Sequence, residues 1–114
     1  MIKKLVTLAA LAMLLGSPAS YAYTTGNNLV EHCKDKEAYF GSGFCYGYMM
    51  GVANILTWAS ERNRICIPDG VTGGQVASIV TKYLKENPES LHESADLLVT
   101  VALGKAFPCN NRDA

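Results

Sequence analysis

The four cysteines are the residues whose type and number most directly suggest chemistry in this 114-residue chain. They are Cys33, Cys45, Cys66 and Cys109. None of them belongs to a Cys-x-x-Cys pair, which structural zinc sites usually contain, so their spacing argues against bound zinc. An even number of cysteines in a short chain is instead typical of two disulfides formed in an oxidising compartment.

A cysteine nucleophile would need a free thiolate with a histidine within reach. His32 directly precedes Cys33, and on a helix this places the two side chains about 100° apart. His92 falls in the first turn of a later predicted helix, where we expect it to face solvent. These positions give no support to cysteine-dependent catalysis.

Three carboxylates, Glu89, Glu93 and Asp96, recur at intervals of four and three residues, so they could share one helical face. Acid–base catalysis requires one carboxyl group in an apolar pocket, facing a second one across a cleft. Neighbours on one solvated helix face do not provide that arrangement. Because no nucleophile, base and oxyanion donor can be assembled, we predict that the chain is not an enzyme and uses no cofactor.

The first 22 residues have the pattern of a secretory signal peptide. Two lysines give a positive start, residues 5–15 are apolar except for Thr7, and Ser20-Tyr-Ala22 is a small-x-small cleavage site. The apolar run, at roughly 12 residues, is shorter than the about 20 residues that a membrane-spanning helix requires. We therefore predict cleavage near Ala22, export to the periplasm, no permanent membrane anchor, and a single mature domain over residues 23–114.

The mature part is nearly neutral in charge. Without the two lysines of the leader, the ten basic residues fall to eight against ten acidic residues, a net charge of about −2. There is no basic run, so the chain lacks the electrostatic pattern of proteins that bind nucleic acid or anionic lipid. A chain of this size is only marginally stabilised by its own core.

Helical periodicity recurs through the mature part, and strand patterns are nearly absent. We predict an all-α fold, a compact bundle of about four helices. The first two helices are expected over residues 27–35 and 43–62, separated by a turn at Tyr39–Gly43 with Ser42 as a cap. The third begins at a capping box, Thr72-Gly-Gly-Gln75, and ends at Asn87-Pro88, and the fourth spans residues 88–106.

The faces of these helices predict how they pack. In the third helix, Val76, Ile79, Val80, Tyr83 and Leu84 are expected to face inward, and Ser78, Thr81, Lys82 and Lys85 to face outward. The fourth helix is apolar on all sides from Leu97 to Leu103 except at Thr100, which is typical of a central helix or one at an oligomer interface.

The second predicted helix has two apolar faces, although a surface helix of a monomer needs only one. One face carries Phe44, Tyr48, Gly51, Ile55 and Ala59, and the other carries Tyr46, Met49, Met50, Ala53 and Leu56. We predict that the second set forms a homodimer interface, since tyrosine and methionine are enriched where proteins meet. Gly47 and Gly51 would let another helix approach closely, either within the same chain or across a dimer.

Four cysteines can pair in three ways. We favour Cys33 with Cys45, which would clip a helical hairpin, and Cys66 with Cys109, which would tie the C-terminal tail to a mid-chain loop. Each disulfide would contribute about 3 to 4 kcal/mol in the chain-entropy model. That is a large share of the stability of a small domain.

Three motifs together resemble the Tai/Rap immunity proteins of type VI secretion. They are Cys45-Tyr-Gly-Tyr-Met-Met-Gly51, Cys66-Ile-Pro-Asp-Gly-Val-Thr72, and Asn87-Pro-Glu89 leading to Ala106-Phe-Pro-Cys109. The resemblance covers essentially the whole mature chain. It implies a helical periplasmic homodimer that protects a bacterium from a peptidoglycan amidase injected by its neighbours. Such toxins are cysteine–histidine peptidases, and the immunity protein occludes their active-site cleft.

No motif marks the residues that face the toxin. The outward side of the third helix and the turn after it are polar, convex and accessible, so we predict toxin binding by Gln75, Ser78, Lys82, Lys85, Glu86, Asn87 and Glu89. The alternative function is a small periplasmic acid-stress chaperone, also helical and disulfide-bonded. Acid would dissociate such a chaperone and expose apolar surface to many clients, whereas an immunity protein should bind one enzyme tightly at neutral pH.

Overall fold

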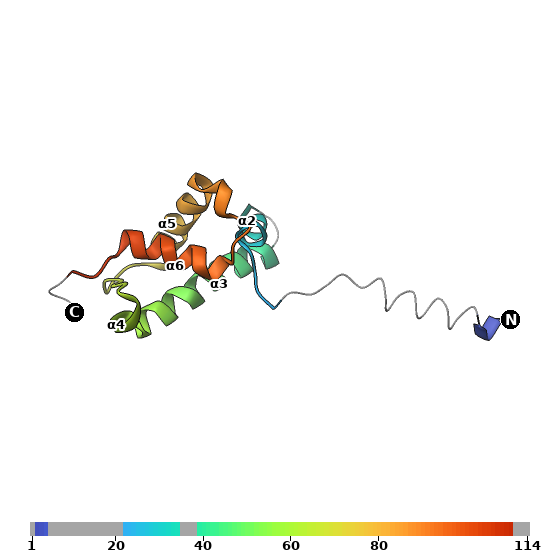
Figure 1. Cartoon of the computed structure of the whole chain (residues 1–114), viewed down its shortest axis with the longest axis horizontal. Coiled ribbons are helices and arrows are strands. Elements are labelled where there is room, and N and C mark those ends of the chain that lie inside the picture. The colour runs from blue at the N-terminus through green and yellow to red at the C-terminus, as the bar shows by residue number, and fades with distance from the viewer. Residues whose placement is uncertain (1, 5–21, 35–38, 111–114) are drawn as a thin grey trace.

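The structure is a computed structural model that describes residues 2–4, 22–34 and 39–110 (Figure 1). These residues are mostly helical and contain no β-strand, which confirms the predicted all-α class. The elements are α2 (Gly26–Lys34), α3 (Tyr39–Trp58), α4 (Ser60–Asn63), α5 (Gly73–Glu86), the 3₁₀ helix η1 (Pro88–Ser90) and α6 (Ala95–Ala106). Four of them are long, as predicted for the bundle.

The predicted signal peptide falls mainly on residues 5–21, which lie outside the described residues. Its cleavage therefore stays a prediction, as does the boundary of the mature domain. In the part of the chain that is described, no helix is both long enough and apolar enough to cross a membrane.

The start of α2 is bonded to the segment that leads into α6. Gly26 N donates to the Glu93 carbonyl oxygen at 2.9 Å, and Asn27 N donates to that of Leu91 at 2.7 Å. The first amides of a helix have no intrahelical acceptors, so these two carbonyls satisfy them. Gly26 also needs to be glycine, because a Cβ there would overlap the Leu98 side chain and lie 2.9 Å from the Leu91 oxygen.

These bonds explain why the prediction of one helix over residues 88–106 is wrong. The segment forms η1, a turn, and then α6, which begins at Ala95. In a continuous helix, Ala95 N would donate to the Leu91 carbonyl oxygen. Here that oxygen accepts from α2, and Ala95 N donates to the Thr24 carbonyl oxygen at 2.6 Å instead. Backbone hydrogen bonds to the segment at the start of α2 therefore take the place of the helical turn that would have joined η1 to α6.

The predicted turn at Tyr39–Gly43, with Ser42 as a cap, is also wrong. α3 is already helical at Tyr39 and continues to Trp58, where the chain breaks into the short α4 rather than running on to Arg62. A glycine inside a helix costs only about 1 kcal/mol relative to alanine, which tertiary contacts can exceed. α3 gains such contacts by burying Met49, Ala53 and Leu56, which are at most 6% exposed.

The prediction for α5 is confirmed at both ends and along its length. Thr72 Oγ1 accepts from Gln75 N at 3.2 Å while Thr72 N donates to Gln75 Oε1 at 2.7 Å, which completes the capping box. At the other end Asn87 Nδ2 donates to the Tyr83 carbonyl oxygen at 2.8 Å. The inward side chains are buried or partly buried as expected, and they are Val76, Ile79, Val80, Tyr83 and Leu84.

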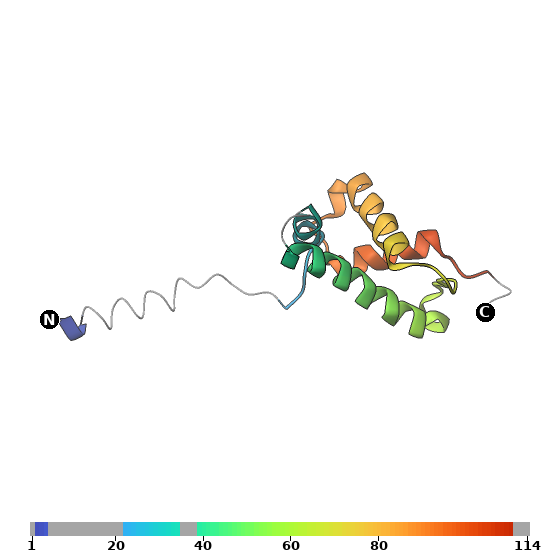
Figure 2. The same cartoon turned by 180° about the vertical axis from the view of Figure 1, so that it is seen from behind.

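α6 is largely buried but not on all sides, because Leu97 is 47% exposed, so the alternatives of a central helix and an interface helix stay open. It packs against both α3 and α5, while α2 closes one end of the bundle against α3 (Figures 1 and 2). Its buried side chains are Ala95, Leu98, Val99, Ala102 and Leu103. Leu29 from α2 is also completely buried. The core therefore draws on all four long helices.

Both favoured disulfides are present. Cys33–Cys45 joins α2 to α3, with 5.1 Å between the Cα atoms. Cys66–Cys109 joins the connection before α5 to the chain after α6, with 4.9 Å between the Cα atoms. The second bridge is flanked by backbone hydrogen bonds from Cys66 N to the Phe107 oxygen and from Cys109 N to the Arg64 oxygen. The two disulfides thus brace different ends of the bundle.

Candidate partner-binding surfaces

The residues that could carry chemistry are used for structure. All four cysteines are in disulfides, so none is available as a nucleophile. The His32 ring lies against the Phe44 ring, with 4.5 Å between the centroids. Among the residues that the structure describes, no three His, Cys, Asp or Glu side chains are grouped closely enough to hold a metal ion.

The three regularly spaced carboxylates are on different elements. Glu89 lies in η1, Glu93 in the turn after it and Asp96 in the first turn of α6, so the predicted common helix face is wrong. Burial, and secondarily the charge of Asp96, raise the pKa of the Tyr48 phenol above its usual value of 10.0. Tyr48 is therefore an uncharged side chain at neutral pH.

Most of the predicted toxin-binding residues form an exposed polar surface. We call Ser78, Lys82, Lys85, Glu86 and Glu89 the α5 surface; all five are exposed. Lys82 Nζ and Glu86 Oε1 are 4.0 Å apart, and their side chains are 76% and 61% exposed. The other two predicted residues, Gln75 and Asn87, use their side chains to cap the two ends of α5.

A groove that sequence reasoning missed lies beside the α5 surface. This α2–α5 groove has a volume of about 460 Å³. It is lined by Val30, Cys33 and Lys34 from α2, by Thr81, Leu84 and Lys85 from α5, and by Pro88 and Leu91 after α5. Its two walls are about fifty residues apart in sequence, so no local motif could have revealed it.

The predicted dimer interface needs correction. Met49, Ala53 and Leu56 are buried in the core of their own chain, so they are not available to a second one. Met50 is partly buried against the same core. Only Tyr46 is largely accessible, at 50% exposure. Its hydroxyl group packs against Gly73 at the start of α5, where a Cβ would overlap it. Periodicity identified two apolar faces, but the core uses the one that we assigned to the dimer, and Phe44 and Tyr48 of the other face also pack partly buried against it.

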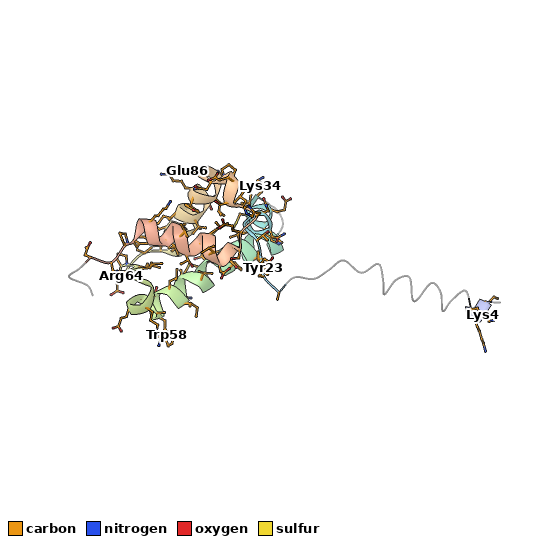
Figure 3. All side chains as sticks on the ribbon, viewed as in Figure 1. Lys4, Tyr23, Lys34, Trp58, Arg64 and Glu86 are labelled. Atoms are coloured by element: carbon orange, nitrogen blue, oxygen red, sulfur yellow. A yellow bond between two sulfur atoms is a disulfide. The ribbon has the colours of Figure 1, made fainter. Side chains whose placement is uncertain are left out.

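The opposite side of α3 is open. A Cβ added at Gly47 or Gly51 would meet no atom of the described residues within 4 Å, so these glycines do not serve close helix packing among the helices from α2 to α6. Ile55 and Trp58 continue the same side and are 65% and 86% exposed. Figure 3 shows Trp58 at the outer edge of the bundle, far from Lys34 and Glu86. We call Gly47, Gly51, Ile55 and Trp58 the α3 outer face.

Comparison with known proteins identifies the protein family. The family model of the Rap1a immunity proteins matches residues 25–109. No curated protein and no solved structure matches the chain. The matched range runs from the residue before α2 to the last cysteine, so it includes every helix from α2 to α6 and both disulfides. Since the match covers far more than half of the chain, the protein belongs to the Rap1a immunity protein family.

Proposed function

We propose that this immunity protein binds a peptidoglycan amidase toxin of type VI secretion and occludes its active site, which protects the cell that makes both. The family match over residues 25–109 carries the immunity role. The amidase target is supported by the three motifs that resemble those of the Tai/Rap immunity proteins. These motifs include Cys45, Cys66 and Cys109, which form disulfides in the structure.

Occlusion needs a rigid surface and no reactive group of its own. The α5 surface fits this requirement, because α5 is capped at both ends and buries Val76, Val80 and Leu84. A surface held in advance loses little conformational entropy on binding, so more of the contact energy appears as affinity. We propose that this surface enters or covers the cleft of the amidase.

The interaction is proposed to take place in the periplasm, where the cell wall is exposed to the toxin. Two observations support this compartment. The chain closes two disulfides, which persist in oxidising environments and are rare in the cytosol. The predicted leader over residues 1–22 would export the chain.

We also propose a homodimer, with the α3 outer face as the contact between the two copies. A large apolar side chain such as Trp58 is costly to leave in water, and tryptophan is enriched at the centres of protein interfaces. The uncovered glycines at positions 47 and 51 would allow a helix of the second copy to approach closely. A stable dimer buries about 800 Å² on each partner, so neighbouring residues of α3 would contribute as well.

The proposed function is tested by measuring whether the chain inhibits a small cysteine–histidine amidase, with candidate toxins sought among the genes that neighbour the gene for this chain. The oxidised chain, purified after export, is added to the amidase in the presence of peptidoglycan, and the release of cleaved stems is followed. We expect loss of activity near one immunity chain per toxin. Undiminished amidase activity with excess immunity protein would contradict the proposal.

The same preparation separates this proposal from the acid-stress chaperone. The exposed Ile55 and Trp58 are the kind of apolar surface that a chaperone presents to unfolded clients. A chaperone would prevent aggregation of several unrelated proteins at acidic pH without inhibiting the amidase. We expect the reverse: specific inhibition at neutral pH and no general protection of acid-denatured clients.

A further inference from the structure

The α2–α5 groove is an apolar recess with walls from two separate elements. Its apolar lining comes from Val30 of α2, from Leu84 of α5, and from Pro88 and Leu91 after the end of α5. Leu84 is only 2% exposed, so it forms the buried floor. At about 460 Å³ the groove is within the range of binding pockets, roughly 300 to 1,000 Å³, and is larger than one side chain requires. Its size suits a short stretch of chain.

The charged side chains among the described lining residues of this groove have one sign. Lys34 and Lys85 line the groove from its two walls, and its described lining residues include no carboxylate. In the described part of the chain neither lysine forms an ion pair, whereas the nearby Lys82 is within 4.0 Å of Glu86. A carboxylate on the occupant would form charge-assisted hydrogen bonds with these ammonium groups, and a positive group there would be repelled.

The groove is continuous with the α5 surface. Thr81 and Lys85 line the groove and also a shallow hollow that contains Ser78, Lys82 and Glu86. A protein seated on the α5 surface would therefore reach the groove without any change in the fold. This continuity favours a protein segment as the occupant over a free lipid.

The walls of the groove are also held in place. Cys33, which lines the groove, is bonded to Cys45 of α3, and the Leu91 carbonyl oxygen accepts from Asn27 at the start of α2. The disulfide fixes α2 against α3, and the hydrogen bond fixes the segment after η1 against the start of α2. The groove is therefore formed before the partner binds, which lowers the entropic cost of filling it.

We propose that the α2–α5 groove receives a short segment of the partner toxin in which apolar side chains enter the recess and an adjacent carboxylate binds Lys34 and Lys85. This inference rests on the proposed immunity function and extends it, because it assigns an anchor site that shares only Lys85 with the predicted toxin-binding residues and states the chemistry of its ligand. Lys34 is the residue that distinguishes the groove from the α5 surface.

The first experiment tests the groove without the toxin. The oxidised chain, purified after export and labelled with ¹⁵N, is titrated with N-acetyl-Leu-Leu-Glu-amide and with N-acetyl-Leu-Leu-Lys-amide as the matched control. We expect the acidic peptide to shift the amide signals of Val30, Thr81, Leu84 and Leu91, with at least fivefold weaker binding of the lysine peptide. Equal binding of the two peptides, no binding, or shifts elsewhere would overturn the proposal. Saturation of the groove by dodecanoate but not by the acidic peptide would overturn it in favour of a lipid ligand.

The second experiment uses the amidase itself. Lys34→Glu is compared with Arg62→Glu, a matched charge reversal on the exposed α4 at the other end of the bundle. We expect Lys34→Glu to weaken amidase binding at least tenfold and Arg62→Glu to leave it unchanged, with both variants oxidised and equally helical. Normal binding of the Lys34→Glu variant would refute the groove while the immunity function stands. Failure of the unaltered chain to bind would refute the proposed amidase target, and the peptide titration would still decide the groove.

Discussion

The α5 surface and the α3 outer face are both exposed, but they differ in the kind of side chain that they present to water. The α5 surface carries charged side chains such as Lys82 and Glu86, with the lysine-rimmed groove beside it. The α3 outer face carries two uncovered glycines and the exposed Ile55 and Trp58. The two lie toward opposite sides of the bundle, as the positions of Glu86 and Trp58 show (Figure 3).

This difference separates two kinds of partner. A charged surface is well solvated when alone, so it suits a partner that arrives later and is selected by complementary charge. An apolar face with a protruding tryptophan is poorly solvated when alone, so it suits a partner that is present from the time of folding, such as a second copy. The predictions below test whether the two surfaces are independent and whether each serves the partner assigned to it.

The largest effects should come from the disulfides that brace both surfaces. Changing Cys66 and Cys109 to serine should lower the free energy of unfolding by about 4 kcal/mol, and changing Cys33 and Cys45 to serine should lower it by about 3 kcal/mol. The difference arises because the Cys66–Cys109 bridge closes the longer loop. Urea denaturation of the oxidised chain and the two double variants measures both values. A greater loss from the shorter loop would contradict the chain-entropy explanation.

A matched pair of glycine substitutions distinguishes the filled side of the bundle from the open one. Gly26→Ala should lower the free energy of unfolding by about 2 kcal/mol, because its Cβ overlaps Leu98 and crowds the Leu91 backbone. Gly51→Ala should raise the monomer's free energy of unfolding by about 0.5 to 1 kcal/mol, since its Cβ meets nothing and alanine is the better helix former. Thermal or urea denaturation at low protein concentration gives the sign of each change, and a destabilised Gly51→Ala monomer would show that the α3 outer face is not open.

The α3 outer face can be tested through self-association. Trp58→Ser should weaken the proposed dimer at least tenfold, about 1.4 kcal/mol, because a central tryptophan is typical of an interface hot spot. Monomer stability should change little, since Trp58 is 86% exposed. Sedimentation equilibrium of the unaltered and variant chains measures the dissociation constant. Unchanged association would mean that the second copy binds elsewhere or not at all.

The α5 surface can be tested through toxin affinity. Lys82→Glu and Lys85→Glu should each weaken amidase binding about fivefold, near 1 kcal/mol, without unfolding the chain, because both side chains are exposed charges. The effect should shrink as salt concentration rises. Calorimetric titration at two salt concentrations provides the affinities, with Trp58→Ser as the variant expected to leave toxin binding unchanged. Identical affinities for the lysine variants and the unaltered chain would remove this surface from the toxin interface.

The smallest effect concerns pH and the inner part of α3. The pKa of the Tyr48 phenol is raised in the folded chain by burial and by Asp96, so the unfolded chain loses this proton more readily. The stability linked to Tyr48 is fully present below pH 10.0 and is lost as the pH rises through the higher folded pKa. Tyr48→Phe should therefore reduce the loss of stability between pH 9 and 11, measured by urea denaturation, while an unchanged pH profile would show that other groups control it.

Sequence reasoning worked best where local chemistry decides the structure. The capping box at Thr72 and Gln75 was predicted because reciprocal bonds between a cap and its third helical residue depend on only a few neighbouring residues. Both disulfides were favoured from their position in the chain. The family resemblance was predicted from three motifs in order and is confirmed by the match over residues 25–109.

It failed where distant segments compete for the same backbone groups or the same core. The break between η1 and α6 depends on bonds from Leu91 and Glu93 to the start of α2, which no local pattern reveals. The two faces of α3 are both apolar, so periodicity could not show that the core takes Met49, Ala53 and Leu56. The groove has walls from α2 and α5 and became visible only when the bundle was assembled.

Hydrogen exchange of the oxidised chain with and without the amidase is the most direct test of the central claim, that the charged side of the bundle binds the toxin and the α3 outer face does not. We expect the toxin to slow exchange in residues 78–91 and in α2, and to leave residues 47–58 unchanged. Protection of residues 47–58 with none in α5 and η1 would contradict the assignment of the two surfaces.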